Sequence, residues 1–293
     1  MASAQDTVGE PMDYPLKRCR AALIAACLAV VTAGCASTPT APTAPAAPPA
    51  PAAPAVPSGQ SEVQPAKEQA TAPPQATFAA PHGLPVTVKE IGPAEEPVDL
   101  QVVTLFNQAS KQAFVESMTD LDSRLGGFVT NVRDSGQFQA NALETLVITP
   151  PPGAIAARRL LFVGLGDSSK ASLDLMDKVG AVVAREAVRL RAPTVAFAPT
   201  LRDQSFDKLD TGQVGAEVMT GAILGYDTEA RLQQQDLDPC FALKHWYYEA
   251  GASYFSDVVE KVGPAVKKAA AQVSSRSNQP FGKTGPQAGK CHT

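Results

Sequence analysis

The sequence predicts an α/β protein in which helices cover both faces of a mixed, mostly parallel β-sheet. Two observations lead to this fold class. Apolar runs of strand length alternate along the chain with longer stretches whose apolar residues recur at helical spacing. Several runs end in turn residues, as at residues 150–153 and 164–166. The alternation covers residues 86–274, which is long enough for one domain with its own hydrophobic core.

Each expected element rests on local composition. The strand segments are short and apolar, and the helical segments carry an apolar stripe on one side. Gly126 and Gly127 interrupt the first helix, and Pro264 is expected to kink or split the last one. In chain order we expect strands at residues 86–89 and 100–106, a helix at 114–132, strands at 143–148 and 159–163, a helix at 173–190, a strand at 194–198, a helix at 212–224, a strand at 241–246 and a helix at 252–273.

The first 34 residues have the three parts of a bacterial export signal. A cluster of cations at residues 17–20 precedes an uncharged run at residues 21–31, and the run leads into Thr-Ala-Gly-Cys at residues 32–35. Small residues directly before a cysteine are typical of a lipoprotein cleavage site. We therefore expect cleavage after Gly34 and acylation of Cys35 with diacylglycerol and palmitate. Met12 is a candidate true start, because residues 1–11 add nothing that a signal needs.

Two alternatives to this anchor fit the sequence less well. Cys27 also follows small residues, but cleavage there would leave an apolar segment of about six residues, below the roughly 7 to 15 of an export signal. A plain transmembrane anchor needs about 20 apolar residues, and the uncharged run at residues 21–34 is shorter. The prediction is a lipoprotein of the cell envelope, on the outer or inner membrane and facing the periplasm.

Behind the anchor, composition predicts a disordered linker. Residues 36–85 are rich in Ala, Pro, Thr, Ser and Gln, and they hold 13 of the chain's 26 prolines. Such a segment cannot bury a core and favours extended conformations. The predicted organisation is a signal peptide at residues 1–34, a lipid-anchored Pro/Ala-rich linker at 35–85, a globular domain at 86–274 and a flexible tail at 275–293.

The cysteine count indicates a possible disulfide, and the net charge bears on the kind of partner. Cys19 and Cys27 leave with the signal and Cys35 is acylated, so the mature protein keeps Cys240 and Cys291. Two thiols in an oxidising periplasm favour one disulfide, and the alternative is two unpaired cysteines. The formal net charge of −4 gives no reason to expect a nucleic-acid partner, because proteins that bind nucleic acids usually carry a basic surface.

One loop is a candidate ligand site. Residues 164–169, Gly-Leu-Gly-Asp-Ser-Ser, follow a predicted strand and precede a predicted helix. Gly164, Gly166, Ser168 and Ser169 could hold a phosphate through free backbone N–H groups at the helix N-terminus. The alternative interpretation is a tight strand-to-helix turn capped by a serine, with no ligand.

The histidines do not indicate a metal site. His82, His245 and His292 are far apart in sequence, and no pair has metal-ligand spacing. No Ser/His/Asp or Cys/His arrangement can be argued either, so we expect no metal and no cofactor. The aromatic residues 246–248 beside His245 are either an exposed recognition patch or a strand that packs one face into the core.

Four segments, taken in order, resemble a known family. They are Asp-Leu-Gln-Val-Val-Thr-Leu-Phe at residues 99–106, Asp-Ser-Arg-Leu-Gly-Gly at 122–127, Glu-Thr-Leu-Val-Ile-Thr-Pro-Pro-Pro at 144–152 and Arg-Arg-Leu-Leu-Phe-Val-Gly-Leu-Gly-Asp at 158–167. In order and spacing they resemble the N-terminal domain of leucyl (cytosol) aminopeptidases, over residues 86–226. The resemblance implies a macro-like, three-layer α/β/α sandwich.

The resemblance also bears on activity. In that family a separate C-terminal domain with two metals hydrolyses peptides, and about 65 residues after Tyr226 are too few to hold it. Asp-Thr-Glu-Ala-Arg-Leu at residues 227–232 faintly echoes the Asn-Thr-Asp-Ala-Glu-Gly-Arg-Leu signature of that domain, but it lacks the asparagine, the ordered core and the glycine. We carry no metal ligand over to it.

Three hypotheses follow from the sequence. The first is a non-catalytic binding or scaffolding lipoprotein with a protein partner. The second is an aminopeptidase-related protein that acts with a separate catalytic subunit. The third is a small-ligand, nucleotide-like sensor that uses the loop at residues 164–169.

Overall fold

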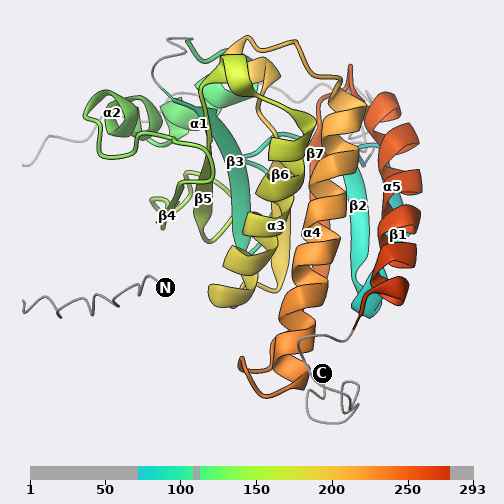
Figure 1. The fold of residues 1–293 in the computed structure, drawn as a ribbon. Helices are drawn as coiled ribbons and strands as arrows, with labels where there is room; N and C mark the ends of the chain where they lie inside the picture. The colour runs from blue at the N-terminus through green and yellow to red at the C-terminus, as the bar shows by residue number, and fades with distance from the viewer. Residues whose placement is uncertain (1–71, 108–112, 278–293) are drawn as a thin grey trace, which may run out of the picture. The chain divides into compact units, whose positions relative to one another are not determined.

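A computed structural model describes residues 72–107 and 113–277 of the chain. Cys35, Cys291, His292, the predicted signal peptide and most of the predicted linker lie outside these residues. The described part forms one seven-stranded sheet in the order β1-β2-β7-β6-β3-β5-β4 (Figure 1). The strands are β1 Gln75–Ala79, β2 Pro85–Glu90, β3 Leu100–Phe106, β4 Thr145–Ile148, β5 Leu160–Gly166, β6 Thr194–Ala198 and β7 His245–Ala250.

The sheet is mixed and mostly parallel, which confirms the predicted fold class. β2, β7, β6, β3 and β5 run parallel to one another, whereas β1 pairs antiparallel with β2 and β4 pairs antiparallel with β5. The central strands are buried throughout, with all seven residues of β3 and of β5 in the interior. Continuous burial is typical of parallel strands that are covered on both faces.

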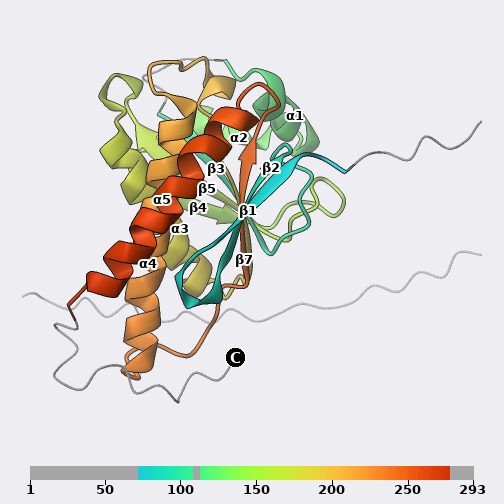
Figure 2. The same cartoon turned by 90° about the vertical axis from the view of Figure 1, so that its right-hand side faces the viewer.

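Helices form a layer on each side of the sheet (Figure 2). α3, α4 and α5 pack on one face, where their apolar side chains meet those of Val102, Leu161 and Trp246. α1 and α2 pack on the other face, against Val103 and Phe162. The helices are α1 Glu116–Arg124, α2 Phe128–Asp134, α3 Leu173–Arg189, α4 Thr211–Gln234 and α5 Phe255–Ser275.

Glycines bring α3 and α4 into direct backbone contact. A Cβ built on Gly180 of α3 would lie 2.0 Å from the Val218 carbonyl oxygen, and one on Gly221 of α4 would lie 1.8 Å from the Asp177 carbonyl oxygen. No side chain fits at either position. The small residues therefore set the distance between the two helices.

The predicted boundary of the linker at residue 85 is wrong. β1 lies inside the segment that composition assigned to the linker, and it forms the edge of the sheet beside β2. Phe78 of β1 packs on Gly263 of α5, where a built Cβ would lie 2.7 Å from the ring. Pairing with the next strand and packing on α5 override the Ala-rich composition, because the edge of β2 supplies the hydrogen-bond partners.

Three other elements also differ from the prediction. α4 extends to Gln234, ten residues past the expected end, because its second half packs between α3 and α5. β7 begins at His245, so the predicted strand at residues 241–246 was placed too early. α5 runs through Pro264 as one helix, because the proline removes one N–H while the buried residues around it hold the helix on the sheet. The first predicted helix is interrupted at Gly126 and Gly127, as expected, and forms α1 and α2.

Within residues 72–107 and 113–277, no helix is both long and apolar enough to span a membrane.

Candidate functional site

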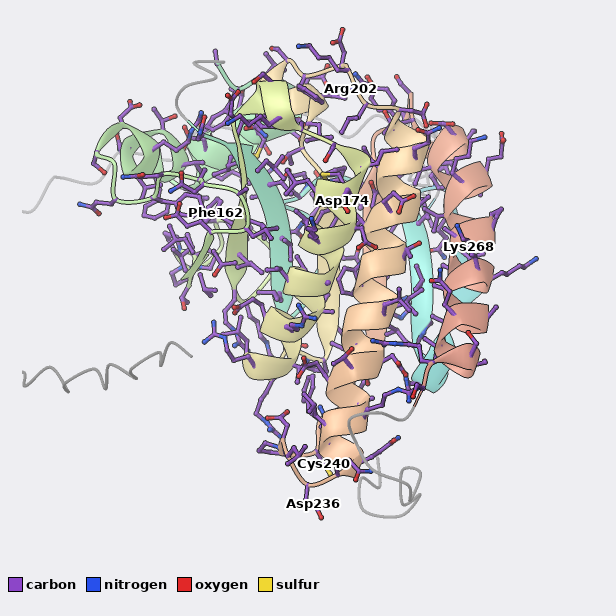
Figure 3. All side chains as sticks on the ribbon, viewed as in Figure 1. Phe162, Asp174, Arg202, Asp236, Cys240 and Lys268 are labelled. Carbon is purple, nitrogen blue, oxygen red and sulfur yellow. The ribbon has the colours of Figure 1, made fainter. Side chains whose placement is uncertain are left out.

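A cavity of about 320 Å³ opens at the carboxyl ends of β2, β6 and β7. The last residues of these strands, Glu90, Ala198 and Ala250, all line it. Arg202, another lining residue, lies at one end of the domain in Figure 3, and Cys240 lies at the opposite end. Ligands of open α/β sheets bind outside the carboxyl ends of the strands, where connections diverge. This cavity is therefore the candidate functional site.

The cavity lies beside the point where the order of the strands reverses. After β3 the chain continues to the side of the sheet that holds β5 and β4. After β6, the strand next to β3, it continues to the opposite side, where β7 lies. Gln204 of η4 (Arg202–Gln204), which is 1% exposed, fills the crevice between β3 and β6. Its Oε1 accepts from the Phe106 N–H at 2.8 Å, and its Nε2 donates to the carbonyls of Thr104 and Thr200 at 2.9 and 3.0 Å. Because Gln204 closes this crevice, the open space lies toward β7 and β2.

Two helices begin at the cavity, and carboxylates of the chain cap both. At α1, the Asp203 carboxylate accepts hydrogen bonds from the hydroxyl of the second helical residue and the N–H of the third. At α4, Asp210 accepts from the Gln213 N–H at 2.8 Å. Asp257 accepts from the Gly212 N–H, also at 2.8 Å. The N–H groups that would otherwise attract an anion are thus partly occupied by side chains of the protein.

Arg202 brings a positive charge to the lining, but the wall of the cavity holds its guanidinium. The guanidinium donates to the carbonyls of Phe206 and Leu209 at 3.3 and 3.1 Å. It also donates to the Thr211 hydroxyl at 3.3 Å, and it lies 5.6 Å from the centre of the Tyr254 ring. Through these contacts Arg202 connects η4 to the start of α4, which is a structural role.

The most unusual group at the cavity is Glu249 of β7. It is 3% exposed, and its carboxyl accepts a hydrogen bond from Gln101 Nε2 at 2.9 Å. Its second oxygen, Oε1, has no partner among the described residues. Burial raises the pKa of Glu249 to about 8, and the nearby charges of Glu96 and Glu95 raise it further. The hydrogen bond from Gln101 and the charge of Lys89 act in the opposite direction. At neutral pH this carboxyl is therefore mostly protonated and uncharged.

The predicted ligand loop lies elsewhere, at the end of β5, and none of its residues lines the cavity. The backbone N–H groups of Gly164, Gly166 and Ser169 donate to oxygens of the chain at 2.8 to 2.9 Å. A Cβ on Gly164 would lie 2.1 Å from the Asn141 carbonyl oxygen, so a packed backbone segment explains this glycine. The end of the loop forms the start of η3 (Ser168–Lys170), which leads toward α3. These contacts favour the turn interpretation, while the phosphate interpretation stays a prediction.

The aromatic cluster of β7 divides between the two faces of the strand. Trp246 and Tyr248 are fully buried in the core. His245 and Tyr247 point to the other face, where their rings stack at 4.1 Å, and His245 Nε2 lies 2.9 Å from the Thr87 hydroxyl. Burial lowers the pKa of His245, although Glu96 opposes the shift. Across residues 72–107 and 113–277, no group of three or more His, Cys, Asp and Glu could hold a metal ion.

The segment that echoes the aminopeptidase signature forms a buried ion-pair cluster. Asp227 is 1% exposed and contacts His82 at 3.0 Å, Arg231 at 2.9 Å and Arg276 at 2.6 Å. The cluster ties α4 to the end of α5 and to η1 (Pro81–Gly83). One carboxylate is thus shared by two arginines and a histidine of the fold, which favours a structural role.

Cys240 is disulfide-bonded. Its partner lies outside the described residues, so the pairing with Cys291 stays a prediction. The Cys240 carbonyl accepts a hydrogen bond from Arg191 at 2.8 Å, which holds this turn against the end of α3.

The sequence interpretation missed the cavity. Its residues come from segments far apart in the chain, and no local motif joins them. One signal was available: Glu249 ends a run of buried and half-buried aromatic residues, and a carboxyl in such an apolar strand is unusual. The strand prediction at residues 241–246 stopped before it.

The layered architecture defines the class of the domain, a three-layer α/β/α sandwich with its cavity at the carboxyl edge of the sheet. Residues 102–232 match the model of the cytosol aminopeptidase family, N-terminal domain. This match, over less than half of the chain, confirms the resemblance that the sequence segments predicted.

Relatives agree with this assignment. A probable cytosol aminopeptidase of Thermosynechococcus vestitus is 29% identical over 135 residues, which cover 46% of this chain and 26% of the relative. A probable cytosol aminopeptidase of Roseiflexus castenholzii is 32% identical over 141 residues, 48% of this chain and 25% of the relative. The chain thus spans about a quarter of the length of these relatives.

Among solved structures, a mutant macrodomain of Oceanobacillus iheyensis has a TM-score of 0.47 and 10% identity, and covers 69% of this chain and 98% of its own. A mutant tomato leucine aminopeptidase has a TM-score of 0.45 and 18% identity, over 70% of this chain and 36% of its own.

Proposed function

We propose that this chain is a membrane-anchored lipoprotein of the cell envelope whose aminopeptidase-type domain is a binding module. The observation that carries the binding role is the cavity at the carboxyl ends of β2, β6 and β7. Its volume of about 320 Å³ falls within the range of small-molecule sites, and its wall combines apolar side chains with a few polar groups. The anchor and the periplasmic location rest on the signal and on Cys35.

The binding role is tested with a cavity variant and a matched control. Ala252 lines the cavity, so Ala252→Trp fills part of it, whereas Ala271→Trp places the same ring on an exposed face of α5. Thermal-shift titrations of the full chain with amino acids, amines, nucleotides and ADP-ribose should give a stabilising ligand. We expect Ala252→Trp to abolish that shift and Ala271→Trp to retain it. Equal shifts in both variants would place binding outside the cavity.

Hydrolysis would contradict the binding-module proposal. The alternative, an aminopeptidase-related activity, predicts that the purified chain releases leucine from leucyl-p-nitroanilide with Mn²⁺ or Zn²⁺. We expect no release above that of a heat-denatured sample. If release occurs only after envelope proteins are added, the chain acts with a separate catalytic subunit.

The anchor has its own test. Cells that express the full chain should incorporate radiolabelled palmitate, and Cys35→Ser should lose the label, while Cys27→Ser keeps it. Label that persists in Cys35→Ser refutes acylation at this residue.

A further inference from the structure

The cavity has a wall that is acidic and apolar. Three of its acidic side chains, Glu90, Glu116 and Asp203, come from β2, α1 and η4. Apolar side chains such as those of Leu201 and Val214 line the same space. A ligand that fills it would contact hydrocarbon surface beside negative charge.

The groups that usually bind an anion are already engaged. The N-termini of α1 and α4 hydrogen-bond to Asp203, Asp210 and Asp257. The Arg202 guanidinium donates to two carbonyls and to a hydroxyl of the wall. A phosphate or carboxylate would have to displace these contacts and approach several carboxylates of the same sign, which is unfavourable in a partly enclosed site.

Glu249 is an independent indication that the cavity holds a ligand with a hydrogen-bond donor. It lines the cavity, it is 3% exposed, and its Oε1 has no hydrogen-bond partner among the described residues. A buried carboxyl oxygen without a partner is rare, because the missing hydrogen bond costs stability. Once the carboxyl is ionised, a ligand that donates a hydrogen bond would satisfy this oxygen, and a charged donor would do so most strongly.

From these contacts we infer that the cavity binds a small amphiphilic cation, a protonated amine on a short hydrocarbon body. This inference rests on the proposed binding function and names the class of its ligand. The ammonium group lies among the carboxyl groups, and the hydrocarbon body packs on the apolar part of the wall. No covalent step is involved.

Binding should be coupled to a proton. Glu249 faces Gln101 from β3, Lys89 from β2, and Glu95 and Glu96 from the segment between those strands. An ammonium group beside Glu249 favours its ionised form, so amine binding releases a proton and strengthens as the pH rises through the pKa of about 8. Lys89 stays paired with Glu96 at 2.6 Å.

A head-group series tests the inference on the full chain. Isoamylamine, isoamyl alcohol and isovalerate share nearly the same hydrocarbon body and carry a cationic, a neutral and an anionic head; ADP-ribose serves as a large anion. In ligand-detected NMR titrations we expect the amine to bind about tenfold more tightly than the alcohol, and the two anions not to bind. The amine should also bind more tightly at about pH 8.5 than at about pH 6.

Variants localise the effect. Glu249→Gln and Glu90→Gln should each weaken amine binding, and Glu249→Gln should also remove its pH dependence. Glu229→Gln, a half-buried glutamate of α4 outside the cavity, should change neither. Because Glu90 is at the end of β2 and half-buried, its variant keeps the test valid if Glu249→Gln misfolds.

The outcomes separate the two proposals. Preferential binding of isovalerate or ADP-ribose, or equal binding of amine and alcohol, overturns the cationic ligand and leaves the binding module standing. If no probe binds and no member of the broader panel shifts the melting temperature, both proposals fail.

Discussion

Glu249→Gln should make the protein more stable at alkaline pH, although it alters a buried residue. Glutamine has the shape of the protonated acid, and its amide oxygen can still accept the hydrogen bond from Gln101 Nε2. The substitution therefore removes the ionisation of Glu249 and little else. This makes it a direct measure of what burial does to the carboxyl.

The magnitude follows from the pKa. Burial raises the pKa of Glu249 from 4.5 to about 8. A group whose pKa is raised by folding contributes stability that is fully present below its unfolded pKa and is lost as the pH rises to the folded value. At about 1.4 kcal/mol per pH unit between the two pKa values, keeping Glu249 protonated in the fold while it ionises in the unfolded chain costs on the order of 3 kcal/mol of the free energy of unfolding at pH 7, and on the order of 4 kcal/mol at pH 8.

Urea denaturation of the full chain at about pH 4.5, 7 and 9 measures this cost. The wild-type and Glu249→Gln proteins should unfold at similar urea concentrations at the lowest pH. The variant should become progressively more stable than the wild type as the pH rises. Glu229→Gln is the control: burial also raises the pKa of Glu229, but Arg185 opposes the shift, and we expect a smaller change. Parallel stability curves for wild type and Glu249→Gln would refute the reasoning.

Three further predictions concern the fold. Gly221→Ala should lower the free energy of unfolding by about 3 kcal/mol, because the added Cβ would meet the backbone of α3. The control Gly92→Ala should be nearly neutral, because no atom lies within 4 Å of its added Cβ. Equal effects of the two variants in thermal melts would contradict the close helix contact. Asp227→Asn leaves two partly exposed arginines without their carboxylate and should cost about 1.5 to 3 kcal/mol. A loss below about 0.5 kcal/mol in urea titrations would show that the cluster is not a structural tie. Peptide mapping without reductant should find Cys240 linked to Cys291, and a link to any other cysteine would show that prediction to be wrong.

Much of the fold was predictable because its signals are local. The strands at residues 100–106 and 194–198 match β3 and β6 to the residue, since both are apolar and bounded by turn signals. The helix at residues 173–190 matches α3, where Ser172 caps the first turn and the apolar residues share one side. The aminopeptidase resemblance rests on the same segments.

The elements that sequence misplaced depend on strand pairing and on packing against other elements. β1 has the composition of a linker, and only pairing with β2 and the contact of Phe78 with Gly263 make it a strand. β7 was placed several residues early because its apolar face is defined by its neighbours in the sheet. Local propensity is weak compared with such pairing and burial.

The sequence by itself determined the fold class and the resemblance to the cytosol aminopeptidase N-terminal domain, and it predicted an anchor at Cys35, because alternation, ordered motifs and an export signal are local patterns. Only the tertiary structure brought Glu90 of β2, Glu249 of β7 and Asp203 of η4 to one cavity. The parallel order of the strands places the ends of β2 and β7 side by side, although they lie at opposite ends of the domain sequence. Burial there changes the charge of Glu249, and burial is a property of the packed fold that no segment carries alone.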